Sequence, residues 1–346
     1  MASKDQAAEE LLDVGLPGYW YVAAKSGEVP TGKPVAVRML GRDLVIWRGA
    51  DGTLRCLDDI CPHRAAPLSR GEVLGSDISC RYHGVTMDGT GKVLSVPGMA
   101  ECSLQGKVAV RSYEVQEQAD AVFVYIPSAA RPNAPELTLP KELTNSEYTS
   151  FLCAAPWKTN YRFILDNLVD PMHGIFLHSN SFTLGGGIKQ DTVKIEETPV
   201  GFIVKRVGQQ SVNFDWSEVI TEGPTMHGRV IIPYPPAAGP GGAMFVITFL
   251  TPVDDTRSRI YFWRARHVPN EFDREAWRFM FRARLETRHW FVLEQDRDML
   301  EHMHASGRAK ETLYQHDAGV VRLRRILTQK ARAEVAAMSS TGEAAE

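Results

Sequence analysis

The residues best suited to chemistry lie in one short stretch, CPHRAAPLSRGEVLGSDISCRYH, which runs from Cys61 to His83. It contains two mixed pairs, Cys61 with His63 and Cys80 with His83, separated by residues 64–79. Thiolate and imidazole groups are both good ligands for transition metals. Each pair can therefore hold one metal ion, and the loop between the pairs can bring the two ions together.

Two thiolates and two imidazoles are the ligands of a Rieske 2Fe-2S cluster, in which His replaces Cys on one of the two irons and raises the reduction potential. A zinc site can use the same four donors. Zinc-finger spacing, however, places the two cysteines together and the two histidines together, whereas each pair here mixes one Cys with one His. The spacing favours the iron-sulfur cluster, and zinc is the alternative.

A second group of candidate ligands lies in the segment DNLVDPMHGIFLH, residues 166–178. His173 and His178 are five positions apart, so on an ideal helix their side chains diverge by about 140°. Both reach one metal ion only if the helix is locally distorted, and Pro171 and Gly174 give a reason for distortion. On their spacing alone, His173 and His178 are equally well interpreted as ordinary, partly buried histidines that bind no metal.

The predicted cluster upstream favours the metal interpretation, because a one-electron carrier can feed a second redox metal in the same chain. The 2-His-1-carboxylate facial triad is the site type that leaves iron(II) positions open for oxygen and substrate. We expect its carboxylate on a rigid helix packed against the histidine segment. The long helix near the C-terminus offers Glu294, Asp296 and Asp298, and their spacing leaves the choice open.

The motifs CPH, CRYH and DNLVDPMHGIFLH resemble the Rieske non-haem iron oxygenases, and the resemblance spans nearly the whole chain. The chain is most similar to compact members of the vanillate O-demethylase and toluenesulfonate methyl-monooxygenase type. The resemblance implies a terminal oxygenase subunit that carries a Rieske 2Fe-2S cluster and a mononuclear non-haem Fe(II). It also implies a homotrimer without a small β-subunit.

The resemblance assigns further roles. Family members place an aspartate ligand in a Glu-Asp-like step on the penultimate long helix, and Gln295-Asp296 matches it with Gln in place of Glu. Asp296 is therefore the implied third iron ligand, with Glu294 as the second choice. Asp170 matches an aspartate that links the Rieske histidine of one subunit to an iron histidine of the next; its alternative role is to cap a turn. Asn167 matches a polar neighbour of the iron.

The elements that position these residues follow from the apolar pattern. Residues 1–16 form a polar leader with a short helical run. Over residues 17–127, short apolar runs between Gly- and Asp-rich turns predict an all-β Rieske domain with the cluster arms on loops. Residues 128–140 are rich in proline and lack periodicity, which predicts a linker. Residues 141–346 are the expected catalytic mononuclear iron domain.

Within that domain, helical spacing predicts a bent helix over 157–176. Strand signals between 193 and 268, including a run over 229–234, predict an antiparallel sheet. Asn270 is typical of an N-cap and predicts a long helix toward residue 304. A last helix is expected over 317–338, with a frayed tail. The expected fold class is α+β, with an N-terminal all-β Rieske domain and a helix-grip-like antiparallel sheet with flanking helices.

Composition limits the class of protein. A formal net charge of -3 argues against a nucleic-acid partner. The N-terminus lacks the pattern of a signal peptide, and no apolar run is long enough to span a membrane. Beyond the two cluster cysteines, Cys56, Cys102 and Cys153 are expected to be reduced thiols, which indicates a cytoplasmic protein.

The resulting hypothesis is a terminal oxygenase that uses O2 to hydroxylate or O-/N-dealkylate a small aromatic substrate, such as an aromatic acid. The chain has no dinucleotide-binding G-x-G-x-x-G after a strand, so its electrons are expected from a flavin-containing reductase, a ferredoxin or both. cis-Dihydroxylation of an aromatic ring is the first alternative, because it uses the same metals. A Rieske electron carrier without catalytic iron is the alternative of another class.

Overall fold

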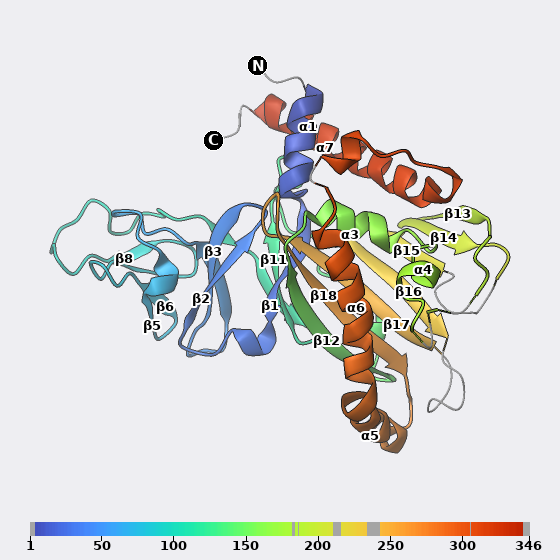
Figure 1. Ribbon diagram of the computed structural model, residues 1–346. Helices are drawn as coiled ribbons and strands as arrows, with labels where there is room; N and C mark the ends of the chain where they lie inside the picture. Colours follow the sequence, from blue (N-terminus) through green and yellow to red (C-terminus); the bar gives the residue numbers. More distant parts are fainter. Residues whose placement is uncertain are drawn as a thin grey trace.

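The computed structural model describes residues 4–181, 184, 185, 187–209, 216–233, 243–304 and 306–341. Small antiparallel sheets fill the N-terminal third, and a seven-stranded antiparallel sheet with helices on one face fills the rest (Figure 1). This arrangement confirms the expected α+β fold class. None of the helices in the described ranges combines the length and apolar composition that a membrane span requires.

The described N-terminal part consists of one α-helix, two short 3-10 helices and three small sheets. Its α-helix and strands are α1 (Lys4–Val14), β1 (Tyr19–Lys25), β2 (Pro34–Met39), β3 (Arg42–Arg48), β4 (Leu54–Asp58), β5 (Glu72–Leu74), β6 (Asp77–Ser79), β7 (Thr86–Met87), β8 (Val93–Ser95), β9 (Ser112–Tyr113), β10 (Val115–Gln118) and β11 (Ala121–Ile126). The strand orders are β1-β11-β10, β2-β3-β4-β9 and β5-β6-β7-β8.

The C-terminal part contains the large sheet and its helices. The strands are β12 (Tyr148–Trp157), β13 (Val193–Thr198), β14 (Gly201–Arg206), β15 (Trp216–Ile220), β16 (His227–Pro233), β17 (Ala243–Pro252) and β18 (Ser258–His267). Their order is β12-β18-β17-β16-β15-β14-β13. The helices are α2 (Lys141–Thr144), α3 (Tyr161–Leu168), α4 (Gly174–Leu177), α5 (Glu271–Met280), α6 (Glu286–Glu301) and α7 (Ala318–Thr341).

The start of the predicted helix over 157–176 is wrong. Trp157 ends β12, and the helical part consists of two short pieces, α3 and α4. Strand β12 escaped notice because Pro156 interrupts its pattern. It lies at the edge of the sheet, where a proline without an N–H donor is tolerated.

The single helix predicted from Asn270 toward residue 304 is interrupted once. The Asn270 side chain caps it as expected, accepting hydrogen bonds from the N–H groups of Phe272 and Asp273. Residues 281–285 then form a π-helical turn between α5 and α6. The last helix matches its prediction closely, whereas Tyr234 and the tail after residue 341 lie outside the described residues.

The seven-stranded sheet has two different faces because successive residues of a strand point to opposite sides. On one face, Phe249 of β17 and Trp263 of β18 pack against Phe123 of β11. The Trp263 and Phe123 rings are stacked with centroids 6.4 Å apart. Trp263 Nε1 also donates to the Ala119 carbonyl at 2.8 Å. This face therefore fixes the N-terminal part to the sheet.

The opposite face carries the alternate residues, among them Val246 of β17 and Ile260 and Phe262 of β18. Helices α3 and α6 lie across this face (Figure 1), and the alternate residues line a cavity beneath them. The same two strands thus bind the N-terminal domain on one side and build a cavity on the other.

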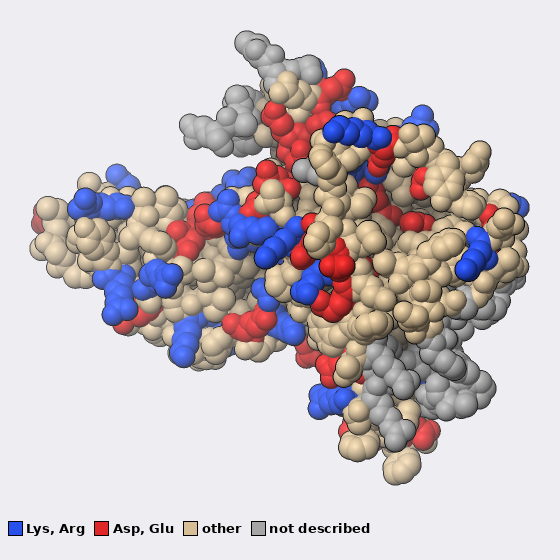
Figure 2. Space-filling model, viewed as in Figure 1, with Lys and Arg blue, Asp and Glu red and all other residues tan. Residues whose placement is uncertain are grey.

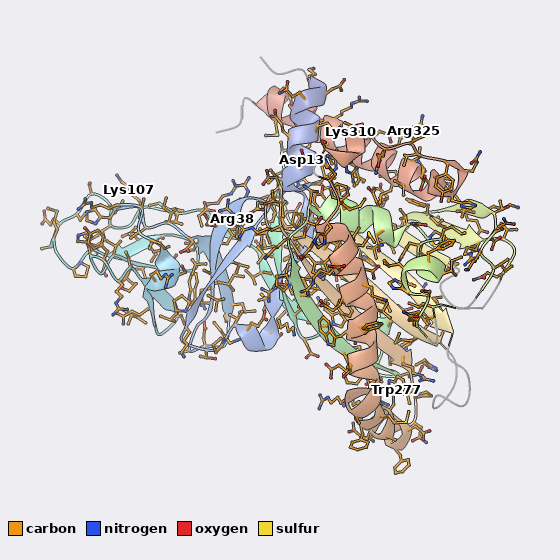
Figure 3. The ribbon with its side chains drawn as sticks, in the orientation of Figure 1. Asp13, Arg38, Lys107, Trp277, Lys310 and Arg325 are labelled. Carbon is orange, nitrogen blue, oxygen red and sulfur yellow. The ribbon has the colours of Figure 1, made fainter. Side chains whose placement is uncertain are left out.

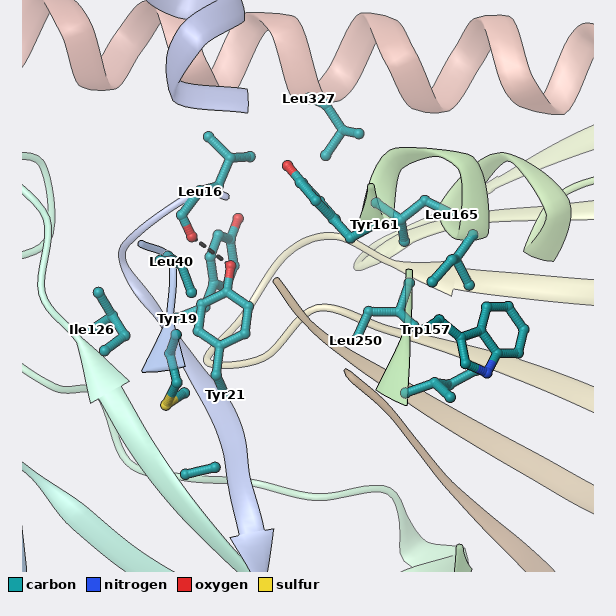
Figure 4. Close-up of a cluster of buried hydrophobic side chains, with 14 of the residues drawn as sticks. Leu16, Tyr19, Tyr21, Leu40, Ile126, Trp157, Tyr161, Leu165, Leu250 and Leu327 are labelled. Atoms are coloured by element: carbon teal, nitrogen blue, oxygen red, sulfur yellow. Dashed lines mark hydrogen bonds between the residues drawn. The ribbon is translucent and has the colours of Figure 1, made fainter. Parts of the chain in front are cut away.

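A further buried cluster joins both ends of the chain (Figure 4). Leu16 and Tyr21 pack there near Tyr161 of α3 and Leu327 of α7, and the Tyr21 hydroxyl donates to the Leu16 carbonyl at 2.5 Å. Helix α1, within the predicted leader, buries Leu12 and packs against α7. The described part of the predicted leader therefore contributes to the core.

Charged side chains gather over the junction between the N-terminal sheets and the C-terminal part, near Arg38 (Figures 2 and 3). Arg38 lies 3.9 Å from Asp254 and Arg259 lies 2.9 Å from Glu28, so both pairs connect the two parts. Exposed pairs of this kind contribute about 1 kcal/mol or less. The apolar packing described above, rather than these ion pairs, holds the two parts together.

His227 of β16 is a buried titratable group outside the predicted sites. Its ring stacks on Phe249 with centroids 5.0 Å apart, and its Nδ1 lies 3.1 Å from Thr225 Oγ1. Burial, reinforced by the nearby charge of Arg229, lowers the pKa of His227 to about 3. The imidazole is therefore neutral in the folded protein at pH 7 and stays neutral well into the acid range.

We expect the free energy of unfolding to fall when the pH drops from 7 to 5. The unfolded chain binds a proton at His227 near pH 6.5, which the folded chain does not, so acid favours unfolding by about 1.4 kcal/mol per pH unit below that value. The contribution at pH 5 is about 2 kcal/mol. Urea unfolding at both pH values measures it, and His227→Gln is the control. An equal pH dependence in the two proteins contradicts the assignment.

Candidate metal centres

The two arms of the predicted cluster have the same backbone conformation. In each arm the cysteine N–H donates to the carbonyl five residues later, and the N–H four residues later donates back to the cysteine carbonyl, at 2.8–2.9 Å. The residue four positions after each cysteine has a positive φ, 55° at Ala65 and 69° at Gly84. Glycine adopts this conformation easily, whereas alanine does so at a cost. The matching turns present Cys61 and Cys80 in equivalent positions.

The side chains of the two arms meet. Cys61 and Cys80 are 2% and 1% exposed, are free thiols, and contact each other through their sulfurs. Burial raises the pKa of the Cys61 thiol, while the N–H groups of His63 and Arg64 that point at its sulfur oppose the rise. His63 and His83 are exposed, and their ring centroids lie 4.4 Å apart.

This donor set fits a Rieske cluster. The two thiols lie inside, the two imidazoles lie at the surface, and N–H groups point at a sulfur, a contact that tunes the potential of iron-sulfur clusters. A site with histidines at the surface allows electrons to enter and leave through the imidazoles. The arrangement follows from placing both arms on loops held by the small sheet β5-β6-β7-β8 and its neighbours.

The second candidate centre begins where α3 ends. Asn160 caps the start of α3 by accepting from the Arg162 N–H at 2.9 Å. The helical run then stops at Leu168 and resumes as α4, with His173 at its first cap and His178 at its last. The predicted distortion is therefore a complete break. It brings the two imidazoles together, with ring centroids 5.3 Å apart.

Asp296 of α6 completes the group. Its Oδ1 lies 3.3 Å from His178 Nε2 and 3.6 Å from His173 Nε2, and one donor atom from each residue lies within 4.8 Å of the others. Neighbouring ligands on an octahedral ion with bonds of about 2.1 Å are about 3 Å apart. The three donors thus stand close to the spacing that one metal ion requires.

The other two acids that the sequence analysis considered point elsewhere. Glu294 pairs with Arg297 at the surface. Asp298 has a side chain that is 81% exposed. Of the three acids that the sequence offered, Asp296 is the one that lies buried beside the histidines.

Neighbouring acceptors fix both imidazoles. Gln295 Oε1 lies 3.0 Å from His178 Nδ1, and the Asp170 carbonyl lies 2.5 Å from His173 Nδ1. Because both oxygens accept, each Nδ1 carries the proton and each Nε2 is directed toward Asp296. Metal-binding histidines commonly donate their other N–H in this way. Burial lowers the pKa of His178, but the hydrogen bond and charge of Asp296 outweigh it and raise the pKa.

The other predicted residues lie nearby. Asn167 Nδ2 is 3.4 Å from Asp296 Oδ1, a long hydrogen bond. Asp170 Oδ1 accepts from the Met172 N–H at 2.8 Å, so the turn-capping alternative is observed. Its Oδ2 lies 3.9 Å from His173 Nδ1, and the side chain is 31% exposed.

The candidate iron site opens onto a cavity of about 140 Å³ between α3, α6 and the sheet. His173, His178 and Asp296 line one part of it, and apolar side chains line most of the remainder. A cavity of about 150 Å³ is enough for a benzene-sized ligand. The site can therefore present a metal ion directly to one aromatic ring.

Two residues at or near the site were missed by the sequence analysis. Gln295 was noticed only as a neighbour of Asp296, and its contact with His178 could not be inferred from one sequence. Arg264 carried a usable signal, because it stands in phase with the apolar Ile260 and Phe262 of β18 and therefore on the cavity face.

Comparison with known families supports the prediction of two metal-binding domains. The Rieske [2Fe-2S] domain family matches residues 19–114, and the vanillate O-demethylase oxygenase C-terminal domain family matches residues 157–333, half of the chain. The chain belongs to the Rieske non-haem iron oxygenases. It combines a Rieske 2Fe-2S domain with the oxygenase domain of a family that uses mononuclear non-haem iron, as the sequence predicted.

Individual proteins of this oxygenase family match the chain at modest sequence identity and over only part of its length. The vanillate O-demethylase oxygenase subunit of Pseudomonas sp. (strain HR199 / DSM 7063) is 32% identical over 52% of this chain and 48% of that protein. The phthalate 4,5-dioxygenase oxygenase subunit of Pseudomonas putida is 27% identical over 72% of this chain and 59% of that protein. The chain thus spans less than two thirds of the length of either relative.

Solved structures support the fold of this Rieske oxygenase. The terminal oxygenase of carbazole 1,9a-dioxygenase from Novosphingobium sp. KA1 has a TM-score of 0.77 at 21% identity, covering 96% of this chain and 97% of that one. Dicamba monooxygenase bound to dicamba has a TM-score of 0.72 at 20% identity, covering 92% and 98%. At such low identity the likeness concerns the fold alone.

We expect Gln295→Leu to weaken iron(II) binding at the second centre about tenfold to a hundredfold, because His178 loses the acceptor that orients its ring. Chelator competition measures the affinity, and the visible absorption of the cluster serves as the internal control. Gln295→Glu keeps an acceptor at this position and should bind iron nearly as the wild type does. Wild-type iron affinity in the leucine variant would rule out this role.

Proposed function

We propose that the chain is the terminal oxygenase of a multicomponent system that monooxygenates a small aromatic substrate, by hydroxylation or by O- or N-dealkylation. One observation carries this proposal: two imidazoles and a carboxylate converge at a cavity sized for one aromatic ring, in a chain that also contains a Rieske domain. An electron carrier alone has no need for such a cavity.

In this proposal the metal ligands are the residues whose donors already converge. They are Cys61, His63, Cys80 and His83 for the 2Fe-2S cluster, and His173, His178 and Asp296 for iron(II). When bound, the cluster supplies single electrons and the iron(II) supplies the centre at which dioxygen is activated.

The chain itself provides position and environment. Asp296, His173 and His178 come from the helices, so the substrate approaches from the cavity, and the apolar walls exclude water and hold the ring. Asn167 keeps the Asp296 carboxylate oriented through its amide. All three imidazole and carboxylate donors must be unprotonated to bind metal, so iron binding weakens in acid.

Asp170 is placed for a role between subunits. One carboxylate oxygen caps the turn, while the other lies at the surface beside His173. The small sheet whose β6–β7 loop contains His83 lies on the side of the molecule remote from α4 (Figure 1). We infer a homotrimer in which Asp170 accepts a hydrogen bond from His83 of the partner subunit and links the two centres.

Electrons are supplied by a separate ferredoxin, a flavin-containing reductase or both. One structural relative is an oxygenase of carbazole 1,9a-dioxygenase in complex with a ferredoxin. We place the protein in the cytoplasm, because all five cysteines are free, which suits a reducing compartment.

Dihydroxylation of an aromatic ring is the second candidate, supported by the similarity to a phthalate 4,5-dioxygenase subunit. The match of the C-terminal half to the vanillate O-demethylase oxygenase domain favours monooxygenation. Product analysis with aromatic ethers and acids, an electron donor and O2 distinguishes a phenol or alcohol from a cis-diol.

The proposal predicts three irons per chain in the loaded protein, two in the cluster and one in the catalytic domain. His173→Ala should keep the two cluster irons and the visible absorption and lose the third iron together with product formation, because one of three iron ligands is gone. Iron analysis and product assays measure both. Two irons in the wild type would indicate an electron carrier, and zinc without visible absorption would indicate an interaction protein.

We expect Asp170→Asn to retain all three irons and to slow turnover at least about tenfold, because the neutral amide lacks the negative charge that lies beside His173 and that would hold His83 of the partner subunit. Asparagine still caps the turn, so the fold is preserved. The rate at which the reduced cluster is reoxidised in the presence of substrate and O2 is the measurement. Asp298→Asn, at an exposed position of α6, is the matched control. Normal reoxidation in the Asp170 variant would remove the link.

A further inference from the structure

One cationic side chain projects from the sheet into the wall of the cavity. Arg264 of β18 is 4% exposed and lies in phase with Ile260 and Phe262, which also line the cavity. Among the described residues of the lining, it is the one lysine or arginine. Arg266, the next residue in phase on β18, is also buried, but it is not part of the cavity lining, and its guanidinium carbon lies 4.1 Å from the ring centre of Trp277.

Aromatic rings hold the Arg264 guanidinium in place. Its central carbon lies 4.8 Å from the ring centre of Phe262, 5.6 Å from that of Phe281 and 5.7 Å from that of Trp290. A guanidinium can stack its face on aromatic rings and use the N–H groups at its edge to bind an oxyanion with two hydrogen bonds. Such a contact is stronger in an apolar site than in water.

The position of Arg264 relative to the candidate iron site follows from helix α6. Trp290, which Arg264 contacts, precedes Asp296 by six residues, a separation of about 9 Å along the helix axis. The cation and the Asp296 carboxylate therefore stand apart in the same cavity. An anionic group is attracted toward Arg264 and repelled from Asp296, so a ring that carries it points its other end at the histidines.

We propose that Arg264 binds the carboxylate or sulfonate of a single-ring aromatic substrate and thereby directs the opposite side of the ring to the iron site. The cavity volume of about 140 Å³ sets the limit of one ring. This inference rests on the proposed oxygenase function and adds the substrate class, a monocyclic aromatic acid.

The test is calorimetric binding to the protein loaded with both metal centres, using benzoate, benzenesulfonate and the neutral benzamide as probes. The wild type should bind at least one anion more tightly than benzamide. Arg264→Met should lose about tenfold or more of the affinity for that anion and keep its affinity for benzamide, because only the charge-assisted hydrogen bonds disappear. Preference for benzoate or for benzenesulfonate identifies the anion as carboxylate or sulfonate.

Two further variants separate charge from packing. Arg264→Lys keeps the charge without the planar fork and should fall between the wild type and Arg264→Met. Arg259→Met removes the same charge from β18 but at a residue that faces away from the cavity, where Arg259 pairs with Glu28. It should leave the affinities for all three probes unchanged.

Three results overturn the assignment: no preference for an anion in the wild type, unchanged anion binding in Arg264→Met, or an equal loss for all three probes. Binding measurements test the anion site and turnover measurements test the oxygenase function, so either proposal can fail without the other. Anion binding that depends on Arg264, without any oxygenated product, refutes the oxygenase and keeps this site. Oxygenation of aromatic acids at the wild-type rate by Arg264→Met refutes the site and keeps the oxygenase.

Discussion

The structure depends on the two-sided packing of strands β17 and β18. Alternate residues of these strands face the N-terminal sheet through Phe249 and Trp263 and face the cavity through Ile260 and Phe262. A shift of either strand by one residue would exchange the two faces and bury neither correctly. The Rieske domain and the cavity are therefore placed relative to each other by the same pair of strands.

The packing of the Rieske domain against β17 and β18 determines where the cluster lies and therefore where it can deliver electrons. The Rieske domain packs behind the sheet and extends away from it, while α3, α4 and α6 lie in front (Figure 1). The cluster arms and the candidate iron site of one chain consequently face different surroundings. The surface carboxylate of Asp170 lies 3.9 Å from His173. The arrangement is consistent with the proposal that a second subunit brings its own cluster to this point.

Local chemistry explains what the sequence could predict. The predicted cluster ligands lie within one stretch whose mixed spacing favours an iron-sulfur cluster over zinc, and Pro171 and Gly174 predict a distortion of the helix that carries His173 and His178. Long-range packing decides the rest. Glu294 and Asp298 each lie two residues from Asp296, so their side chains are directed about 200° away from that of Asp296 around the helix. Only the docking of α6 on α3 decides which of the three acids faces the histidines. Gln295 contacts His178 across 117 positions, which one sequence does not reveal.

Helix α3 also needs support on its outer side, because the site must stay rigid while a metal binds. The carboxylate of Asp166, one residue before Asn167, accepts from Arg308 at 2.6 Å and from Arg324 of α7 at 2.8 Å. Burial raises the pKa of Asp166, against the opposing effect of these arginines. Buried pairs of this kind add little net stability, yet removing one partner leaves an uncompensated charge and is costly. Helix α7 therefore provides no metal ligand but restrains the helix that leads into the histidine segment.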